Sequence, residues 1–226
     1  MEQFVVAGQQ VRALSIAVDE GEPLQVLLLA HPESALEGAI RGERDPYAGI
    51  LWPSSIALAR AIVPEIEAGS HVIDAGAGTG LISLAAARRG ARVLALDHDP
   101  VALQLLAAAA ARQSLPLETA LFDLTSSQPL PRCDLIIFSD LLYQRDFALM
   151  VAGRAVEAVR HGARVLVGDP GRIGRDAFTA AVAAHGLVTD FVPVRVEVPE
   201  EERDEWIGIA RLQPHPDRTP VESMPE

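Results

Sequence analysis

The chain has 226 residues, of which 49% are hydrophobic and 22% charged, a balance typical of one large globular domain rather than of a disordered chain. Its formal net charge of -12 repels a phosphate backbone, so we expect no nucleic-acid partner. The single cysteine excludes an intramolecular disulfide, and no stretch is long and apolar enough to span a membrane, so we expect a soluble, cytoplasmic protein without a membrane partner.

The N-terminal part of the chain is predicted to be an extension to the main domain. Two apolar runs, 11–18 and 24–29, flank an acidic turn and are typical of a β-hairpin. A short helix is expected over 34–42. The segment Asp45-Pro46-Tyr47 ends it, because the residue before a proline is pushed out of the helical region. The predicted parts are therefore an extension over residues 1–44, a main domain over 45–212 and a proline-rich, disordered tail over 213–226.

From Ser70 onward, short apolar runs alternate with helical stretches, which is the pattern of a parallel sheet with helices on its faces. The last two apolar runs, 187–198 and 206–212, have no helix between them and are expected to pair antiparallel. We therefore predict an α/β fold, a Rossmann-like, doubly wound sheet of five parallel strands plus this C-terminal hairpin. The five strands are expected over 72–74, 91–96, 117–122, 133–138 and 164–167. The helices are expected over 56–67 with a serine cap, 81–89, from Asp99-Pro100 through the alanine run 107–111, 146–159 and 175–184.

A glycine-rich turn after the first of these strands carries the strongest functional signal. Glycines at 76, 78 and 80 leave the backbone without Cβ atoms where a strand turns into a helix, so a ligand can lie against the main chain. Asp97 ends the next strand, where a carboxylate can accept both hydroxyl hydrogens of a ribose. The pattern predicts a nucleoside ligand.

The spacing of the turn is G-x-G-x-G and not the dinucleotide fingerprint G-x-G-x-x-G, which disfavours a nicotinamide-dependent oxidoreductase. Asp74, just before the glycines, repels phosphate and suits a cationic amino-acid group. The combination resembles motif I of the class I S-adenosylmethionine-dependent methyltransferases. This resemblance implies S-adenosyl-L-methionine as the cofactor, with Asp74, Gly76, Gly78 and Gly80 at its binding turn.

Two further acidic residues follow strand ends. Asp123 ends the third strand, where a methyltransferase would place it beside the adenine amine, although an aspartate that starts a loop is an equal alternative. Asp140 and Tyr143 follow the fourth strand. A carboxylate there can stabilise the positive charge that develops on a nitrogen during methyl transfer. The structural alternative is a helix-start aspartate with a core tyrosine.

Three ordered motifs over residues 45–172 make the resemblance more specific. They are Asp45-Pro46-Tyr47-Ala48-Gly49-Ile50-Leu51-Trp52-Pro53, Asp140-x-x-Tyr143 and Gly168-Asp169-Pro170-Gly171-Arg172. Together they resemble the family 16 protein lysine methyltransferases, in particular the branch that acts on the electron-transfer flavoprotein β-subunit. The resemblance implies that Trp52, Gly76, Gly78, Asp97 and Asp123 contact the cofactor, that Asp140 and Tyr143 face the target nitrogen, and that Tyr47 and Arg172 lie near the cleft mouth. A core anchor at Trp52 and a plain turn at 168–171 are the structural alternatives.

The leading hypothesis is methylation of lysine side chains in a protein substrate, with the electron-transfer flavoprotein β-subunit as the first candidate. One alternative is a small amine or a nicotinamide-type nitrogen as the acceptor. Another is a cofactor-binding partner protein without turnover. The six histidines lack metal-ligand spacing, so no metal site is expected.

Overall fold

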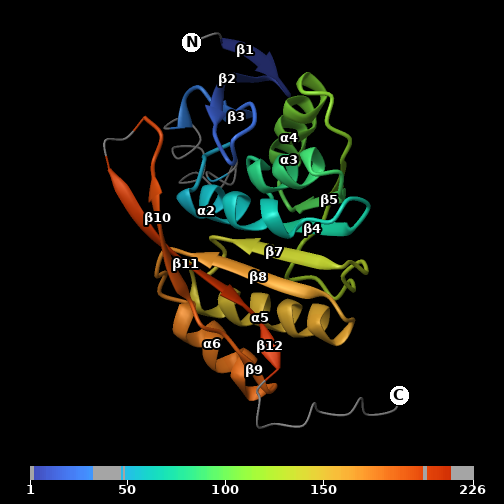
Figure 1. Cartoon of the computed structure of the whole chain (residues 1–226), viewed down its shortest axis with the longest axis vertical. Helices are drawn as coiled ribbons and strands as arrows, with labels where there is room; N and C mark the ends of the chain where they lie inside the picture. Colours follow the sequence, from blue (N-terminus) through green and yellow to red (C-terminus); the bar gives the residue numbers. More distant parts are fainter. Residues whose placement is uncertain (1–2, 33–46, 48, 201–202, 215–226) are drawn as a thin grey trace.

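The structure is a computed structural model that describes residues 3–32, 47, 49–200 and 203–214 (Figure 1). Its centre is a seven-stranded sheet. The strands, in spatial order, are β10 (Val192–Glu197), β11 (Asp204–Arg211), β8 (Arg164–Asp169), β7 (Leu135–Ser139), β4 (His71–Ala75), β5 (Arg92–Asp97) and β6 (Glu118–Leu121). Strands β4 to β8 are mutually parallel, and β11 runs antiparallel to both β8 and β10. This confirms the predicted fold of five parallel strands and a C-terminal hairpin.

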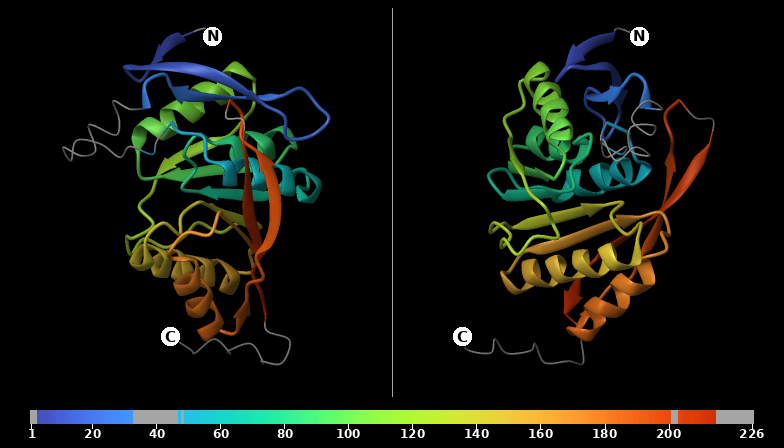
Figure 2. Two further views of the ribbon diagram at one scale, coloured as in Figure 1. Left: turned by 90° about the vertical axis from the view of Figure 1, so that its left-hand side faces the viewer. Right: turned by 180° about the vertical axis from the view of Figure 1, so that it is seen from behind.

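Helices cover both faces of this sheet (Figures 1 and 2). One face carries α2 (Pro53–Ile62), the short η1 (Val63–Glu65), α3 (Leu81–Arg88) and α4 (Pro100–Arg112), and the other carries α5 (Arg145–Arg160) and α6 (Arg175–Ala184). Because both faces are covered, the central strands are continuous apolar runs, and the four residues from Leu135 to Phe138 are completely buried. Asp99 caps α4 by accepting a 2.7 Å hydrogen bond from the backbone N–H of Val101, as the Asp99-Pro100 start predicts.

A separate three-stranded sheet stands at the N-terminus, in the order β1 (Gln3–Val6), β2 (Gln9–Ile16) and β3 (Leu24–Leu29). The two runs predicted as a hairpin pair antiparallel as β2 and β3, and β1 adds a strand that was not predicted. The sheet packs against α3 and α4 and joins their apolar core. The short helix predicted over 34–42 lies outside the described residues.

Several element boundaries differ from the sequence predictions. The helix predicted over 56–67 with a serine cap is α2, which begins at Pro53 and ends at Ile62. Its N-cap is Trp52 and makes no side-chain cap bond, and proline fits the first helical turn. Cys133 precedes β7 instead of starting it, and burial raises the pKa of its thiol to about 11. The predicted strand 187–198 is interrupted, so that β9 (Leu187–Val188) is separate from β10.

The structure describes only the first two residues of the predicted tail, 213 and 214. Gln213 and Pro214, which were placed in the tail, form β12 (Gln213–Pro214) and pair with β9. Residues 215–226 lie outside the description. Among the described helices, none is both long and apolar enough to cross a membrane.

The direction of chain progression through the sheet changes between β4 and β7. From β4 the chain moves outward to β5 and β6, and β7 then lies on the other side of β4. In open α/β sheets the ligand crevice lies at the carboxyl ends of the strands at such a reversal. The glycine turn follows β4 and Asp140 follows β7, so the fold brings the two predicted motifs to the same crevice.

Candidate active site

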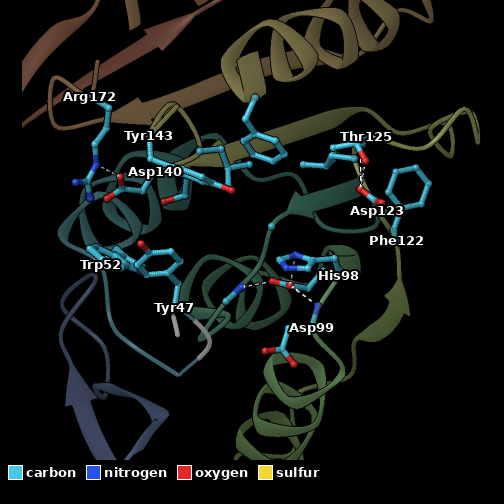
Figure 3. A pocket seen from close by; sticks show the side chains of 17 residues that line it. Tyr47, Trp52, His98, Asp99, Phe122, Asp123, Thr125, Asp140, Tyr143 and Arg172 are labelled. Carbon is cyan, nitrogen blue, oxygen red and sulfur yellow. Dashed lines mark hydrogen bonds and ion pairs between the residues drawn. The ribbon is translucent and has the colours of Figure 1, made fainter. Parts of the chain in front are cut away.

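A cavity of about 430 Å³ lies at this crevice, within the range of ordinary ligand pockets. Figure 3 shows its two ends, with His98, Asp99, Asp123 and their neighbours at one and an aromatic group with Asp140 and Arg172 at the other. Of the nine residues predicted to bind or react, seven line the cavity. They are Trp52, Gly76, Gly78, Asp97, Asp123, Asp140 and Tyr143.

The glycine turn forms the floor of the cavity. Gly76 and Gly78 have φ angles of +71° and +53°, which favour glycine. A Cβ on Gly78 would meet nothing within 4 Å, so the space above it is open to a ligand. A Cβ on Gly76 would come within 2.9 Å of the Leu141 side chain. Gly78 is therefore the position at which a ligand can approach the backbone closely.

Gly80 and Asp74, which were also predicted at the cofactor-binding turn, are not among the residues that line the cavity. A Cβ on Gly80 would lie 2.2 Å from Leu106 Cδ1, so this glycine permits close packing between α3 and α4. Asp74 is 1% exposed, and its Oδ2 accepts hydrogen bonds from the backbone N–H (3.1 Å) and the hydroxyl (2.7 Å) of Ser83. Burial raises the pKa of Asp74 to about 7. Asp74 thus attaches α3 to β4, and Gly80 lets α3 pack closely against α4.

Asp97 faces the cavity from the end of β5. Its Oδ2 accepts from the backbone N–H of Gly78 at 2.8 Å and its Oδ1 from that of Asp99 at 2.9 Å, while the His98 ring nitrogen lies 3.4 Å from Oδ1. Burial raises the pKa of this carboxyl, and the two backbone hydrogen bonds oppose that shift. Each carboxylate oxygen keeps a second lone pair, so both can still accept the hydroxyls of a sugar.

Asp123 begins the loop that forms the wall beyond Asp97. Its Oδ1 accepts from the backbone N–H of Thr125 at 2.8 Å and from the Thr125 hydroxyl at 2.7 Å. These bonds lower the pKa of Asp123, which is exposed to solvent. Asp123 therefore starts a turn and also lines the cavity, so the two alternatives from the sequence are compatible.

Arg154 on α5 supports the same loop from below, and no sequence motif pointed to it. Its Nε donates to the Leu124 carbonyl at 2.9 Å, it also donates to the Ser126 carbonyl, and its guanidinium carbon lies 5.6 Å from the centre of the Phe122 ring. Arg154 pairs with Glu157 at 2.8 Å and is buried. A buried arginine with these partners fixes the loop that carries Asp123.

Asp140 lies at the opposite end of the cavity. Its backbone is left-handed (φ +58°), and its N–H donates to the Gly168 carbonyl at 2.9 Å. Arg172 Nε donates to Oδ1 at 2.7 Å, and the Ser54 hydroxyl donates to Oδ2 at 3.3 Å. A non-glycine residue in this conformation is uncommon and often marks a functional position, because the surrounding structure must hold it there.

Aromatic rings surround this carboxylate. Tyr47 lies 5.8 Å from Trp52 and 6.2 Å from Tyr143 between ring centres, and Tyr143 stacks on Phe147 at 5.1 Å. Figure 3 shows Trp52, Tyr47 and Tyr143 grouped beside Asp140. Apolar walls around one carboxylate suit an aliphatic chain that ends in an amine.

The turn after β8 carries Arg172 to this end of the cavity. The buried side chain of Asp169 accepts from the backbone N–H groups of Gly171 (2.8 Å) and Arg172 (3.0 Å), and it pairs with Arg175 at 2.7 Å. The segment 168–171 is therefore a turn, and it also positions Arg172. Within the described residues, no group of three or more histidine, cysteine, aspartate or glutamate side chains is arranged to hold a metal ion.

Comparisons with known proteins agree with this geometry. Residues 72–168 match the family model described as "Methyltransferase domain". The N-methyltransferase NodS from Bradyrhizobium japonicum, solved with S-adenosyl-L-homocysteine, shares the fold with a TM-score of 0.54 and 16% identity, over 70% of this chain and 84% of that one. Residues 72–168 therefore match a methyltransferase domain, and the chain shares the fold of NodS.

Similar curated proteins indicate a more specific group of methyltransferases. The electron transfer flavoprotein beta subunit lysine methyltransferase of Mus musculus is 35% identical over 170 residues, which are 73% of this chain and 64% of that protein. The Xenopus laevis protein of the same name is 36% identical over 133 residues, 57% of this chain and 54% of that protein. The chain is thus a homologue of these lysine methyltransferases, although the alignments span less than two thirds of their length.

Proposed function

We propose that this chain is an S-adenosylmethionine-dependent N-methyltransferase that acts on lysine side chains of a protein. The observation that carries the proposal is one cavity with two chemically different ends. One end has the glycine turn and Asp97, which suit a nucleoside, and the other has Asp140 among aromatic rings, which suits an amine.

The residues present fit the cofactor. The open space above Gly78 allows a ligand to approach the backbone, and the free lone pairs of Asp97 can accept the two ribose hydroxyls. Asp123 would accept from the adenine amine, and Trp52 would pack against the amino-acid portion at the other end of the cavity. Gly76 completes the floor. Asp74 and Gly80 would support this binding turn without touching the cofactor.

Asp140 and Tyr143 would act on the target amine. The chemistry that the bound cofactor would supply is an electrophilic methyl group. The neutral amine would form the new N–C bond, the electrons of the broken S–C bond would stay on sulfur, and the nitrogen would then release a proton to solvent. The Asp140 carboxylate would orient the amine and stabilise the positive charge on its nitrogen. Tyr143 and its aromatic neighbours would hold the aliphatic part of the lysine and exclude water.

The electron-transfer flavoprotein β-subunit is the substrate we propose to test first, since the relatives at 35–36% identity are named for it. A net charge of -12 is compatible with a partner segment that carries lysines. The broader proposal is that the substrate is a protein. The narrower proposal is that this protein is the flavoprotein β-subunit.

The test is incubation of the purified chain with S-adenosylmethionine labelled on the methyl group and with recombinant flavoprotein. We expect label on lysines of the β-subunit, located by peptide mass spectrometry. The Asp140→Asn variant keeps the size of the side chain and removes its charge, so it should bind S-adenosylhomocysteine like the wild type and lose methyl transfer by about 100-fold or more. The chain itself contains no lysine, so label on its own side chains cannot be mistaken for lysine methylation.

Two results would contradict the proposal. Wild-type protein that binds the cofactor but labels neither the flavoprotein nor other lysine-bearing proteins, while it labels a small amine or nicotinamide, would replace the protein acceptor with a small one. Unchanged methyl transfer by the Asp140→Asn variant would remove Asp140 from the reaction.

A further inference from the structure

The carboxylate that is proposed to receive the amine already holds a cation. Arg172 Nε donates to Asp140 Oδ1 at 2.7 Å, and the side chain of Asp140 is only 4% exposed, whereas that of Arg172 is 36% exposed. A buried carboxylate without a partner is energetically costly, so Asp140 needs a counter-ion when no substrate is present. Arg172 supplies that counter-ion.

Arg172 also has interactions that do not involve Asp140. Its guanidinium carbon lies 5.3 Å from the centre of the Trp52 ring, a distance at which a cation is attracted to the ring face. Its backbone is fixed by the buried Asp169. These contacts hold the guanidinium beside Asp140 and near the face of Trp52.

The charges around the pair determine what an incoming amine meets. The hydrogen bond that Arg172 donates to Asp140 raises the pKa of Arg172. The negative charges of Asp140, Asp169 and Glu205 add to this shift, so the guanidinium stays protonated. The phenols nearest to the pair belong to Tyr47 and Tyr143 of the aromatic group, which lies beside Asp140. The remaining titratable groups of the cavity are Asp97, His98, Asp99 and Asp123 at its far end.

An ammonium ion entering this site would place a second cation beside a single neutralised carboxylate. A neutral amine needs no counter-ion and can accept a hydrogen bond where the ammonium cannot. A free lysine amine has a pKa near ~10.4 and is mostly protonated at neutral pH, yet only its neutral form has the lone pair that methyl transfer uses. A cation held next to Asp140 thus favours the reactive form.

We propose that Arg172 is the internal counter-ion of Asp140 and makes this site select the neutral form of an amine over its ammonium form. The inference rests on the proposed function, because it concerns the amine that this function methylates. Arg172 acts through Asp140 and does not touch the reacting atoms, so it is a positioning residue.

The test is the binding of n-butylamine, which has the four-carbon chain and amine of lysine, measured by calorimetry at pH 7 and pH 10 with S-adenosylhomocysteine absent and present. In the Arg172→Gln variant, Asp140 has lost its cation, so this variant should bind butylammonium at pH 7 about tenfold more tightly than the wild type. The gain should vanish in the double variant Arg172→Gln/Asp140→Asn. Ser54→Ala removes the neutral partner of the same carboxylate and should leave the pH preference of the wild type in place.

Equal or weaker binding by the Arg172→Gln variant at pH 7, or no measurable binding by either protein, would overturn the inference. If thermal unfolding shows that this variant does not fold, Arg172→Met is measured in its place, with the same expectations. The kinetic readout is the pH profile of kcat on the flavoprotein, which reports the protonation of the amine in the complex. Its acidic limb should move up by about one pH unit in Arg172→Gln.

The two proposals fail in different ways. If no lysine is methylated by the wild type but the Asp140-dependent gain in butylammonium binding is present, the proposed function fails and the role of Arg172 stands. If the wild type methylates lysine and the variant shows neither the gain nor the shifted profile, the role of Arg172 fails and the proposed function stands.

Discussion

The backbone N–H of Gly78 donates to Asp97 Oδ2 across 2.8 Å, which joins the glycine turn after β4 to the acid at the end of β5. This bond holds one carboxylate oxygen in place, and the N–H of Asp99 holds the other. The proposed sugar-binding group is therefore oriented before a ligand arrives, which reduces the entropy lost on binding.

The first prediction concerns Asp97. Asp97→Ala removes the carboxylate and leaves the Gly78 N–H without its acceptor, so affinity for S-adenosylhomocysteine should fall roughly 10- to 100-fold in calorimetric titration. Asp97→Asn keeps one acceptor oxygen and should lose less. Equal affinity of Asp97→Ala and wild type would mean that the sugar is bound elsewhere.

Two glycines of one turn should respond differently to the same substitution. Gly80→Ala forces a Cβ to within 2.2 Å of Leu106 at a φ of +72°, and should cost about 2 kcal/mol or more in the free energy of unfolding. Gly78→Ala meets no protein atom, so it should cost about 1 kcal/mol of stability and mainly weaken cofactor binding. Urea denaturation and cofactor titration of both variants separate the effects, and a reversed order would contradict the assignment.

Arg154 should control the loop that carries Asp123. Arg154→Met removes hydrogen bonds to the carbonyls of Leu124 and Ser126 and leaves both acceptors poorly satisfied, at a cost of about 1–3 kcal/mol. Hydrogen exchange of residues 122–126 should become faster, and cofactor affinity should fall. The exposed Arg160 on the same helix is the matched control, since Arg160→Met should leave both measurements near the wild-type values. Slower or unchanged exchange in Arg154→Met would be inconsistent with this role.

Asp74 predicts a pH dependence of stability. Its pKa in the folded protein is about 7, above the ordinary value of 3.8, so the folded state binds the proton more tightly than the unfolded state. The contribution of Asp74 to the free energy of unfolding is largest below pH 4 and is lost as the pH rises through 7. The total loss is a few kcal/mol. Asp74→Asn retains an acceptor for Ser83 and cannot ionise. The fall in unfolding free energy between pH 5 and pH 8 should therefore be smaller in this variant than in the wild type, and an identical fall would exclude Asp74 as its source.

Much of the fold could be predicted from the sequence because its determinants are local. The apolar runs and their intervening helices follow from periodicity, and helix 175–184 was predicted with the boundaries that α6 has. Asp97 and the glycines at 76 and 78 could be placed at the crevice because a strand–turn–helix unit fixes where its turn lies. Strand β1 is short and partly polar, so periodicity gave no signal for it.

The features that could not be predicted from the sequence concern contacts between distant segments. Asp74 and Gly80 fit the motif as well as Gly76 and Gly78 do, and only their packing against Ser83 and Leu106 distinguishes structural from lining positions. Arg154 lies in the middle of a helix with no motif around it, 30 positions from the carbonyl that it supports. The pairing of Arg172 with Asp140 depends on the adjacency of β7 and β8, which the local sequence of either residue does not encode.

The roles proposed for the cavity residues all require that the cavity between the glycine turn and Asp140 binds S-adenosylhomocysteine. Calorimetric titration of the wild-type protein with this nucleoside tests that claim directly. We predict saturable binding at one site per chain, with NAD giving no such signal. A folded protein that releases no binding heat with S-adenosylhomocysteine, and whose melting temperature the compound does not raise, would contradict the cofactor and with it the proposed reaction.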